Sequence, residues 1–169
     1  MYLMSKEFLQ AVQENTRNFY WTGKITTKAG VEYPFTYDDI VKGSGYVTAQ
    51  CCGSSEIEPG TVYAAEMGIY LYSEMGIYLY SKIDRYTLKD AKVELSYHLQ
   101  LADGSYEEVP VGIFEVCEAN RTVNCLELKA YDYMLRFDRS FNGFETVGKA
   151  YAFLELCCLA CDVELANGP

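Results

Sequence analysis

Residues 92–117 restrict the fold of this chain more than any other segment. Residues 92–101 alternate between apolar and polar side chains, which places Val93, Leu95, Tyr97, Leu99 and Leu101 on one face of a strand. Asp103-Gly104 and a second strand-forming run, 106–117, come next, and an Asp-Gly pair between two such runs favours a type I′ hairpin. Because Pro110 has no backbone N–H, we expect the returning strand to lie at a sheet edge or to contain a bulge there.

A tandem repeat of eight residues precedes this hairpin: residues 66–73, EMGIYLYS, recur unchanged as residues 74–81. Because strand side chains alternate, an insertion of even length preserves the face of every residue, so either copy can occupy the same place in a sheet. One predicted face holds Met67, Ile69, Leu71, Met75, Ile77 and Leu79, and the other holds Tyr70, Tyr72, Tyr78 and Tyr80. The repeat is interpreted as a duplication that lengthens a strand or loops out, or alternatively as a pairing element between subunits.

Helices are predicted at both ends of the chain. Ser5 is placed to cap the first, whose apolar residues recur at helical spacing and which we expect to end before Tyr20. Thr146 is placed to cap the second. An apolar stripe runs along that helix and should be buried against the rest of the protein; it consists of Val147, Tyr151, Leu154, Cys158 and Cys161. Between the helices, residues 24–35 predict a further hairpin that turns at Gly30.

Together these elements predict an α+β fold dominated by strands, in which a partly open β-barrel is flanked by an N-terminal and a C-terminal helix. We interpret residues 1–169 as a single domain, or alternatively as two small subdomains. The first of these, 1–60, would hold a helix and a hairpin, and the second, 61–169, an antiparallel barrel and the last helix. The predicted core consists of Val93, Leu95, Leu99, Ile113, Phe114, Leu126, Leu128, Tyr151 and Leu154.

Charge and composition exclude several classes of partner. The chain has 24 acidic and 14 basic residues, a net charge of −10, and no Lys/Arg stripe of the kind that binds nucleic-acid phosphates or anionic lipids. No stretch reaches the roughly 18 uncharged apolar residues of a spanning helix, and Lys6 and Glu7 interrupt the first apolar segment, which argues against a secretory signal. We therefore expect a soluble protein without a nucleic-acid partner or a membrane span.

The residues that could carry chemistry form no recognisable constellation. His98 is the only histidine, and no acid is placed by the sequence to orient it as a catalytic base. Cys158 and Cys161 form a C-x-x-C pair, but they lie near a predicted helix C-terminus, where the thiol rather than the thiolate is favoured. The seven cysteines are interpreted as reduced thiols that mostly fill the core.

Metal, nucleotide and glycosidase sites are likewise not indicated. The other cysteines offer no second pair with the two-residue spacer of a structural zinc site, and the chain has no P-loop, dinucleotide or calcium-loop motif. A glycosidase needs two carboxylates opposed across a cleft, which a sequence alone cannot reveal. We expect no catalytic, cofactor-binding or metal-binding residues and no enzymatic activity.

Several ordered phrases of the chain resemble the N-terminal part of phage and prophage tail proteins of the baseplate hub, or tail-associated, family. The matching stretches are SKEFL at 5–9 with NTR at 15–17, GS at 43–44, PGTVYAAE at 59–66, DGSYEEVPVGIFEV at 103–116, AYDYMLRFD at 130–138 and TVG at 146–148. These are turn and packing motifs, and together they span most of the chain. Family members are usually much longer, and a single copy of the octamer would be expected.

The resemblance implies a structural component of a tail tip or baseplate hub. It implies a homo-oligomer, a trimer, that contacts tail-tube, distal tail or tape-measure proteins, assembles in the bacterial host cytoplasm and ends in the tail of a virion or phage-like particle. Tyr70, Tyr72, Tyr78 and Tyr80 are the candidate interface residues, although they would equally suit the solvated face of an ordinary sheet. The alternatives are a fragment of a tail-associated cell-wall hydrolase or protease, and a ligand- or carbohydrate-binding β-module.

Overall fold

The computed structural model describes residues 3–49, 61–72, 85–122, 124–140 and 149–165. These residues contain two α-helices, three short 3₁₀-helices and seven strands, joined by turns and loops. The helices are α1 (Lys6–Gln13), η1 (Tyr37–Asp39), η2 (Arg85–Leu88), η3 (Tyr133–Phe137) and α2 (Ala150–Ala160). The strands are β1 (Phe19–Thr26), β2 (Glu32–Phe35), β3 (Tyr46–Thr48), β4 (Glu66–Tyr72), β5 (Lys92–Gln100), β6 (Tyr106–Arg121) and β7 (Cys125–Asp132).

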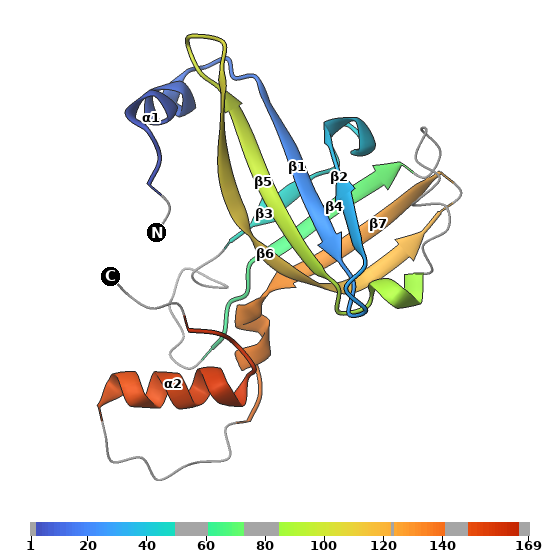
Figure 1. Ribbon diagram of the computed structural model, residues 1–169, viewed down its shortest axis with the longest axis vertical. Helices are drawn as coiled ribbons and strands as arrows, with labels where there is room; N and C mark the ends of the chain where they lie inside the picture. Colours follow the sequence, from blue (N-terminus) through green and yellow to red (C-terminus); the bar gives the residue numbers. More distant parts are fainter. Residues whose placement is uncertain (1–2, 50–60, 73–84, 123, 141–148, 166–169) are drawn as a thin grey trace.

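All seven strands belong to one antiparallel sheet with the order β2-β1-β5-β6-β7-β4-β3. Figure 1 shows this sheet strongly curled, with α1 beside the tip of the β5–β6 hairpin and α2 beyond the opposite end. The predicted α+β fold, a strand-dominated sheet that is not closed and has a helix at each end, is confirmed. Strands from before and after residue 60 share this sheet, and the proposed domain boundaries stay a prediction.

A short backbone contact brings the two sides of the curled sheet together. The amide of Val41, which follows β2 and η1, donates to the carbonyl oxygen of Tyr70 at 2.8 Å. Ile40 forms an isolated antiparallel bridge with Leu71 of β4. Since β2 lies at one edge of the sheet and β4 lies next to the other edge, this contact holds the sheet in its curl without completing a barrel.

The predicted β5–β6 hairpin is confirmed, but the predicted turn type is wrong. Leu101 N–H donates to the Ser105 carbonyl, and Gly104 N–H donates to the Leu101 carbonyl. A type I′ turn needs a positive φ at both central residues, whereas in this turn Gly104 alone has one, of 86°. This pattern is a type I turn followed by a left-handed glycine, and the Asp103 carboxylate supports it by accepting the amide of Ser105. The β1–β2 hairpin turns at Gly30 as predicted, with a φ of 79°.

Pro110 occupies the kind of position that its missing N–H requires. The pairing of β5 with β6 shifts between Leu95 and Ser96, whose partners are Gly112 and Pro110, so β6 has a bulge here. On its other side, β6 pairs with β7 only from Phe114 onward. Pro110 therefore lies at a bulge and on a stretch of β6 that, among the described strands, pairs on one side only, so both predicted features are present.

The core lies on the concave side of the sheet. Its main cluster contains five of the predicted core residues, and a sixth, Leu99, lies in a second cluster. The six confirmed core residues, each at most 2% exposed, are Val93, Leu95, Leu99, Phe114, Leu126 and Leu128. The prediction for Ile113 is wrong, because 42% of its surface is exposed. Ile113 and Phe114 are consecutive residues of one strand and must face opposite sides, and Phe114 takes the inner side.

α1 is anchored to the β5–β6 hairpin by a second, smaller core. Phe8 and Ala11 of the helix pack with Leu99 of β5, and Ser5 caps the helix as predicted by accepting the amide of Phe8 at 2.9 Å. Glu107 of β6 in turn accepts the backbone amide of Ser5 at 3.0 Å. The helix ends at Gln13, earlier than the predicted end just before Tyr20, and Phe19 begins β1.

α2 does not bury the side that its sequence predicts. Cys158 and Cys161 are buried, at 5% and 9% exposure, but the predicted core residues Tyr151 and Leu154 are exposed, at 53% and 44%. The physical reason is position, because α2 lies beyond η3 rather than on a face of the sheet. Thr146 and Val147 lie outside the described residues, and Lys149 is the residue that precedes the helix. Neither described α-helix has the length and apolar character needed to cross a membrane.

Candidate interaction surface

The first copy of the octamer forms β4 and alternates as predicted. Met67, Ile69 and Leu71 are at most 1% exposed and face the core, whereas Tyr70 and Tyr72 are each 37% exposed on the outer side. The second copy, with Tyr78 and Tyr80, lies outside the described residues. The structure thus places two of the four predicted interface tyrosines on one outer surface.

Strand register gathers more polar and aromatic residues around these two. β4 pairs with β7 so that Gly68 lies opposite Lys129, Tyr70 opposite Glu127, and Glu66 opposite Tyr131. β3 places Tyr46 opposite Gly68 from the other side. We call this outer surface of β3, β4 and β7 the tyrosine face; it consists of Tyr46, Glu66, Tyr70, Tyr72, Glu127, Lys129 and Tyr131.

Glu66 is the centre of the tyrosine face. Its carboxylate accepts the hydroxyl of Tyr46 at 2.7 Å and forms an ion pair with the Lys129 ammonium at 3.2 Å. The Lys129 ammonium also lies 5.5 Å from the centroid of the Tyr131 ring, within the range of a cation–π contact. One carboxylate, one ammonium and two rings from three strands are therefore held together.

These contacts set the ionisation of the groups in a consistent way. The Tyr46 hydroxyl, and more weakly Tyr131 and Lys129, lower the pKa of Glu66 below its ordinary value. The same hydrogen bond raises the pKa of Tyr46, and the Tyr131 hydroxyl together with Glu66 raises the pKa of Lys129. At neutral pH Glu66 is a carboxylate already occupied by internal partners, which suits a structural role better than proton transfer.

A second hydrogen bond holds the next tyrosine along β4. The Tyr70 hydroxyl donates to Glu127 of β7 at 2.8 Å, and this bond raises the pKa of Tyr70. The hydroxyls of Tyr46 and Tyr70 are thus both tied to carboxylates of their own sheet. Rings that are fixed in advance lose little rotational freedom when a partner covers them, which favours contact surfaces.

A hollow of about 430 Å³ adjoins the tyrosine face. Tyr131 and Glu66 form one wall of it, and the full lining is Thr48, Val62, Tyr63, Ala64, Glu66, Tyr131 and Leu135. Two tyrosines, a threonine and a carboxylate can offer stacking surfaces together with a few hydrogen-bonding groups. The hollow is therefore the place where the tyrosine face could take a small group of a partner or a ligand.

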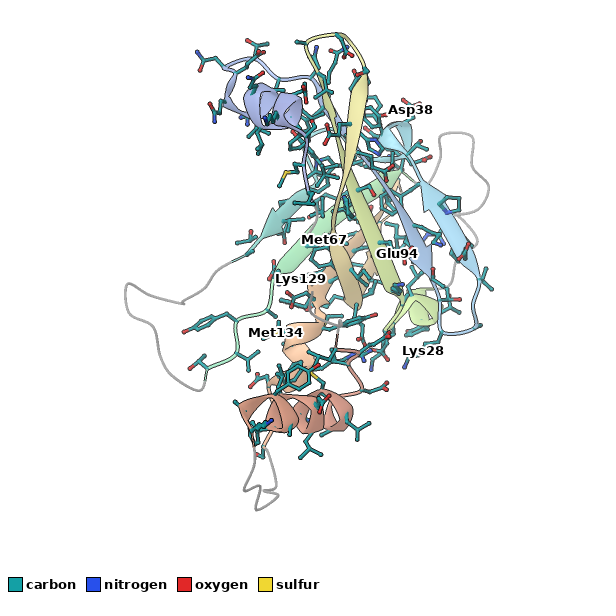
Figure 2. The ribbon with its side chains drawn as sticks, turned by 60° about the vertical axis from the view of Figure 1, so that its left-hand side comes forward. Lys28, Asp38, Met67, Glu94, Lys129 and Met134 are labelled. Atoms are coloured by element: carbon teal, nitrogen blue, oxygen red, sulfur yellow. The ribbon has the colours of Figure 1, made fainter. Side chains whose placement is uncertain are left out.

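Arg136 of η3 connects the sheet to the C-terminal helix. Its Nη2 lies 2.6 Å from a carboxylate oxygen of Glu115 on β6, and its Nε donates to the same oxygen at 2.8 Å. Its Nη1 donates to the backbone carbonyl of Asp162, just after α2, at 2.5 Å. A smaller hollow of about 200 Å³ lies beside Arg136 and is lined by residues of β6, β7 and η3, together with Asp90. Figure 2 shows Met134 of η3 lying close above α2.

The other residues singled out in the sequence lie apart from the tyrosine face. His98 is on the outer side of β5, where a ring nitrogen lies 2.8 Å from the Thr22 hydroxyl and the ring stacks on Tyr20 at 4.5 Å. The described cysteines are free thiols, and Cys158 and Cys161 are buried as expected. The prediction that the cysteines mostly fill the core is wrong for the other three described ones, because Cys117 is exposed and Cys125 and Cys157 are only partly buried. Within the described ranges, no three His, Cys, Asp or Glu side chains gather as metal ligands.

The sequence did not reveal Tyr46, Glu66, Lys129 and Tyr131 as members of the same surface as Tyr70. A signal was present in β7, where Leu126, Leu128 and Ala130 alternate with the polar residues and so direct those outward. What was missing was the pairing of β7 with β4, which are separated by more than fifty residues and meet only through the sheet order.

Similarity to known proteins is found at the level of the fold. No family model matches the chain, and no curated protein sequence matches it. Among solved structures, the fold matches a chain of the virion of a native gene transfer agent particle, with a TM-score of 0.50 and 13% identity. The match covers 83% of this chain and 49% of the other, so this chain corresponds to about half of its structural neighbour. At this level of identity, the likeness establishes a shared fold.

Proposed function

We propose that this protein is a structural component of a phage or phage-like particle and that it acts at the tail tip or baseplate hub. In this role it assembles as a homo-oligomer, a trimer, and contacts tail-tube, distal tail or tape-measure proteins. It works through contact surfaces and needs no catalytic group. Its place is the host cytoplasm during assembly and afterwards the tail of the particle.

One observation carries the proposal: the fold extends over 83% of the chain in common with a protein of a gene transfer agent virion. The ordered phrases of the sequence point to tail proteins independently of that likeness. Neither argument depends on a catalytic motif, because both rest on turns, strand register and packing.

The chemistry of the tyrosine face supports a contact role. Tyrosine is enriched in the cores of protein interfaces, because the ring packs while the hydroxyl keeps a hydrogen bond. Here the hydroxyls of Tyr46 and Tyr70 already have acceptors in their own sheet, Glu66 and Glu127. A partner can therefore cover the rings without leaving these hydroxyls unsatisfied.

Electron microscopy of particles labelled with an antibody against this chain tests the proposal. Particles are induced from a cell that contains the gene, purified on a density gradient, and labelled after treatment with nuclease. We expect label at one end of the tail. Label on the capsid, or its absence from particles while the protein is abundant in the lysate, would overturn the proposal.

A second candidate function is favoured by the hollow beside the tyrosine face. Tyr63 and Tyr131, together with Glu66 and Thr48, provide the aromatic wall and the few polar anchors of a carbohydrate-binding site. Titration with soluble cell-wall oligosaccharides, followed by tyrosine fluorescence, tests it. Saturable quenching that is lost in Tyr63→Ala supports sugar binding, and an unchanged signal throughout the titration contradicts it.

A further inference from the structure

The two identical octamers provide two equivalent segments for one strand of the sheet. β4 is formed by residues 66–72 of the first copy, and the second copy repeats the same seven residues as 74–80. The second copy lies outside the described residues. Because its side chains are identical, every contact that a β4 side chain makes is also available to the residue eight positions further along the chain.

Contacts on both faces of β4 depend only on residues that the second copy repeats. The core residues of β4 and their counterparts are Met67 and Met75, Ile69 and Ile77, and Leu71 and Leu79. On the outer face, Glu74 can replace Glu66 between the Tyr46 hydroxyl and the Lys129 ammonium. A shift of eight residues is even, so it also preserves the face of each side chain.

The residues that precede β4 tolerate the same shift. Ala65 packs against the core, and its carbonyl oxygen accepts the amide of Asp132 at 2.9 Å. After a shift of eight residues its place is taken by Ser73, which has an equivalent carbonyl and a side chain of similar size. Ala64 borders the hollow of about 430 Å³, so the larger Tyr72 would find room in its place.

The connection that follows β4 is long enough for the shift. Tyr72 pairs with Cys125 of β7, which in turn lies beside the end of β6. There Asn120 of β6 and Tyr86 of η2 line a common hollow. The span from β4 to η2 therefore crosses two strand spacings, about 10 Å. With Tyr80 in the place of Tyr72, the chain that remains before η2 can span up to about 17 Å.

The two arrangements also have similar loop-closure costs. Residues 49–65 connect β3 with β4, and residues 73–84 connect β4 with η2. The shift lengthens the first connection by eight residues and shortens the second by eight. Because the closure cost depends on the logarithm of loop length, these changes alter the ratio of the two states by only about threefold.

We propose that β4 exists in two registers, formed by the first and by the second copy of the octamer, which interconvert by a shift of eight residues. Only one copy can hold the strand position at a time, and the copy left out has the same composition in both states, so the states differ little in apolar burial. Interconversion requires β4 to leave the sheet and is thus a local unfolding event. The inference does not depend on the assembly role proposed above.

The shift gives the hollow beside the tyrosine face two different linings. In the described register the lining includes Val62, Tyr63 and Ala64. In the second register residues 70–72, with the sequence YLY, come to these three positions. A partner or ligand that fits only one lining binds one register and shifts the population toward it. The duplication therefore provides one surface in two forms.

Aspartate at the central core position of each copy tests the inference, because a buried unpaired carboxylate excludes that copy from β4. Ile69→Asp and Ile77→Asp each leave the other copy intact, and Leu128→Asp on β7, at a buried residue without a duplicate, calibrates the full cost. Urea unfolding is followed by circular dichroism. Each single variant should lower the folding equilibrium constant by about fivefold or less, because one of two similarly populated states is lost. The double variant should lower it by about a hundredfold or more, as Leu128→Asp does.

A larger cost in either single variant, up to that of Leu128→Asp, would overturn the inference, and so would a double variant as stable as the singles. A stability of Ile69→Asp that rises with protein concentration would also overturn it, because the second copy would then come from another chain. Other substitutions in the first copy, such as Gly68→Ala and Glu66→Gln, are measured on the Ile77→Asp background, where only the first copy fits β4. The particle labelling described above decides the proposed function separately.

Discussion

The ring of Tyr46 lies directly over Gly68, so close that a β-carbon on Gly68 would overlap the ring. The nearest atoms to that β-carbon would be Cε1 and Cζ of Tyr46. They belong to the far end of a flexible side chain, which can rotate away. Gly68 therefore provides the space in which Tyr46 lies flat on the sheet and reaches Glu66. The identity of one strand residue sets the geometry of the tyrosine face.

Gly68→Ala should displace Tyr46 and break its hydrogen bond to Glu66, at a cost of about 1 kcal/mol in the free energy of unfolding. In a Tyr46→Ala background the added methyl has room, and the same substitution should be neutral or stabilising, since alanine restricts the unfolded chain. Urea unfolding of the four proteins in this cycle measures both effects. An equal cost of Gly68→Ala in the two backgrounds would refute the contact.

Gly23→Ala should be more damaging than Gly68→Ala. A β-carbon on Gly23 would overlap both the Phe35 ring and the backbone carbonyl oxygen of Glu94 on the neighbouring strand. Since the strand backbone cannot swing aside as a side chain can, we expect a loss of about 2 to 3 kcal/mol. Urea unfolding measures this loss, and a cost equal to or below that of Gly68→Ala would contradict the prediction.

A leucine-to-alanine substitution should lower the free energy of unfolding much more in the buried sheet than on the exposed helix α2. Leu128→Ala removes a fully buried side chain and should cost about 2 to 5 kcal/mol. Leu154→Ala, at a position where 44% of the side chain is exposed, should cost under about 1 kcal/mol in the monomer. Thermal unfolding at low protein concentration, where association is minimal, measures the difference. Similar costs would show that α2 is packed as the sequence had predicted.

The contacts of Glu66 predict a pH dependence of stability. Its pKa is lower in the folded protein than the ordinary value of 4.5, mainly because of the Tyr46 hydroxyl. The ionised form is thus favoured by folding, so its contribution is present above about pH 4.5 and is lost as the pH falls through the lowered pKa. Glu66→Gln should lose less stability than the wild type between pH 6 and pH 3 on this account.

Urea midpoints at several pH values measure this difference. Glu14→Gln, at an exposed residue after α1, is the control and should follow the wild-type curve. If Glu66→Gln also follows the wild-type curve, the hydrogen bond with Tyr46 does not persist in solution.

Arg136→Ala should loosen α2 and leave the sheet intact. The variant removes the contacts of the guanidinium with Glu115 and with the Asp162 carbonyl. Amide hydrogen exchange should accelerate in α2 while that of β5 and β6 stays unchanged. Arg136→Lys should not restore protection, because an ammonium cannot span both partners as a planar guanidinium does. Full protection of α2 in Arg136→Ala would show that other contacts position it.

Local patterns were enough to predict most strands and, apart from Ile113 on β6, the faces of their apolar residues. Alternation in β4 and β5 identified the buried residues correctly, and the two hairpins and the Ser5 cap followed from turn and capping chemistry. Patterns of this kind depend on residues that are close in sequence, and they report the face of a strand wherever that face is buried.

The error at α2 and the incomplete prediction of the tyrosine face come from tertiary placement, whereas the error at Gly104 is local. The stripe on α2 has helical spacing, but periodicity cannot say whether a helix lies on the sheet or beyond its end. The turn at Gly104 was misassigned because Asp-Gly serves both the type I′ turn and the type I turn with a bulge. The tyrosine face depends on the pairing of β3, β4 and β7, which the sequence order does not reveal.

Quantitative mass spectrometry of gradient-purified particles tests the central claim most directly, namely that this chain is a building block of a phage-like particle. The account predicts this chain at a fixed ratio to the tail-tube protein, in multiples of three copies per tail, in every fraction that contains intact tails. A ratio that varies between preparations, or removal of the chain by a salt wash that leaves the tails intact, would contradict it.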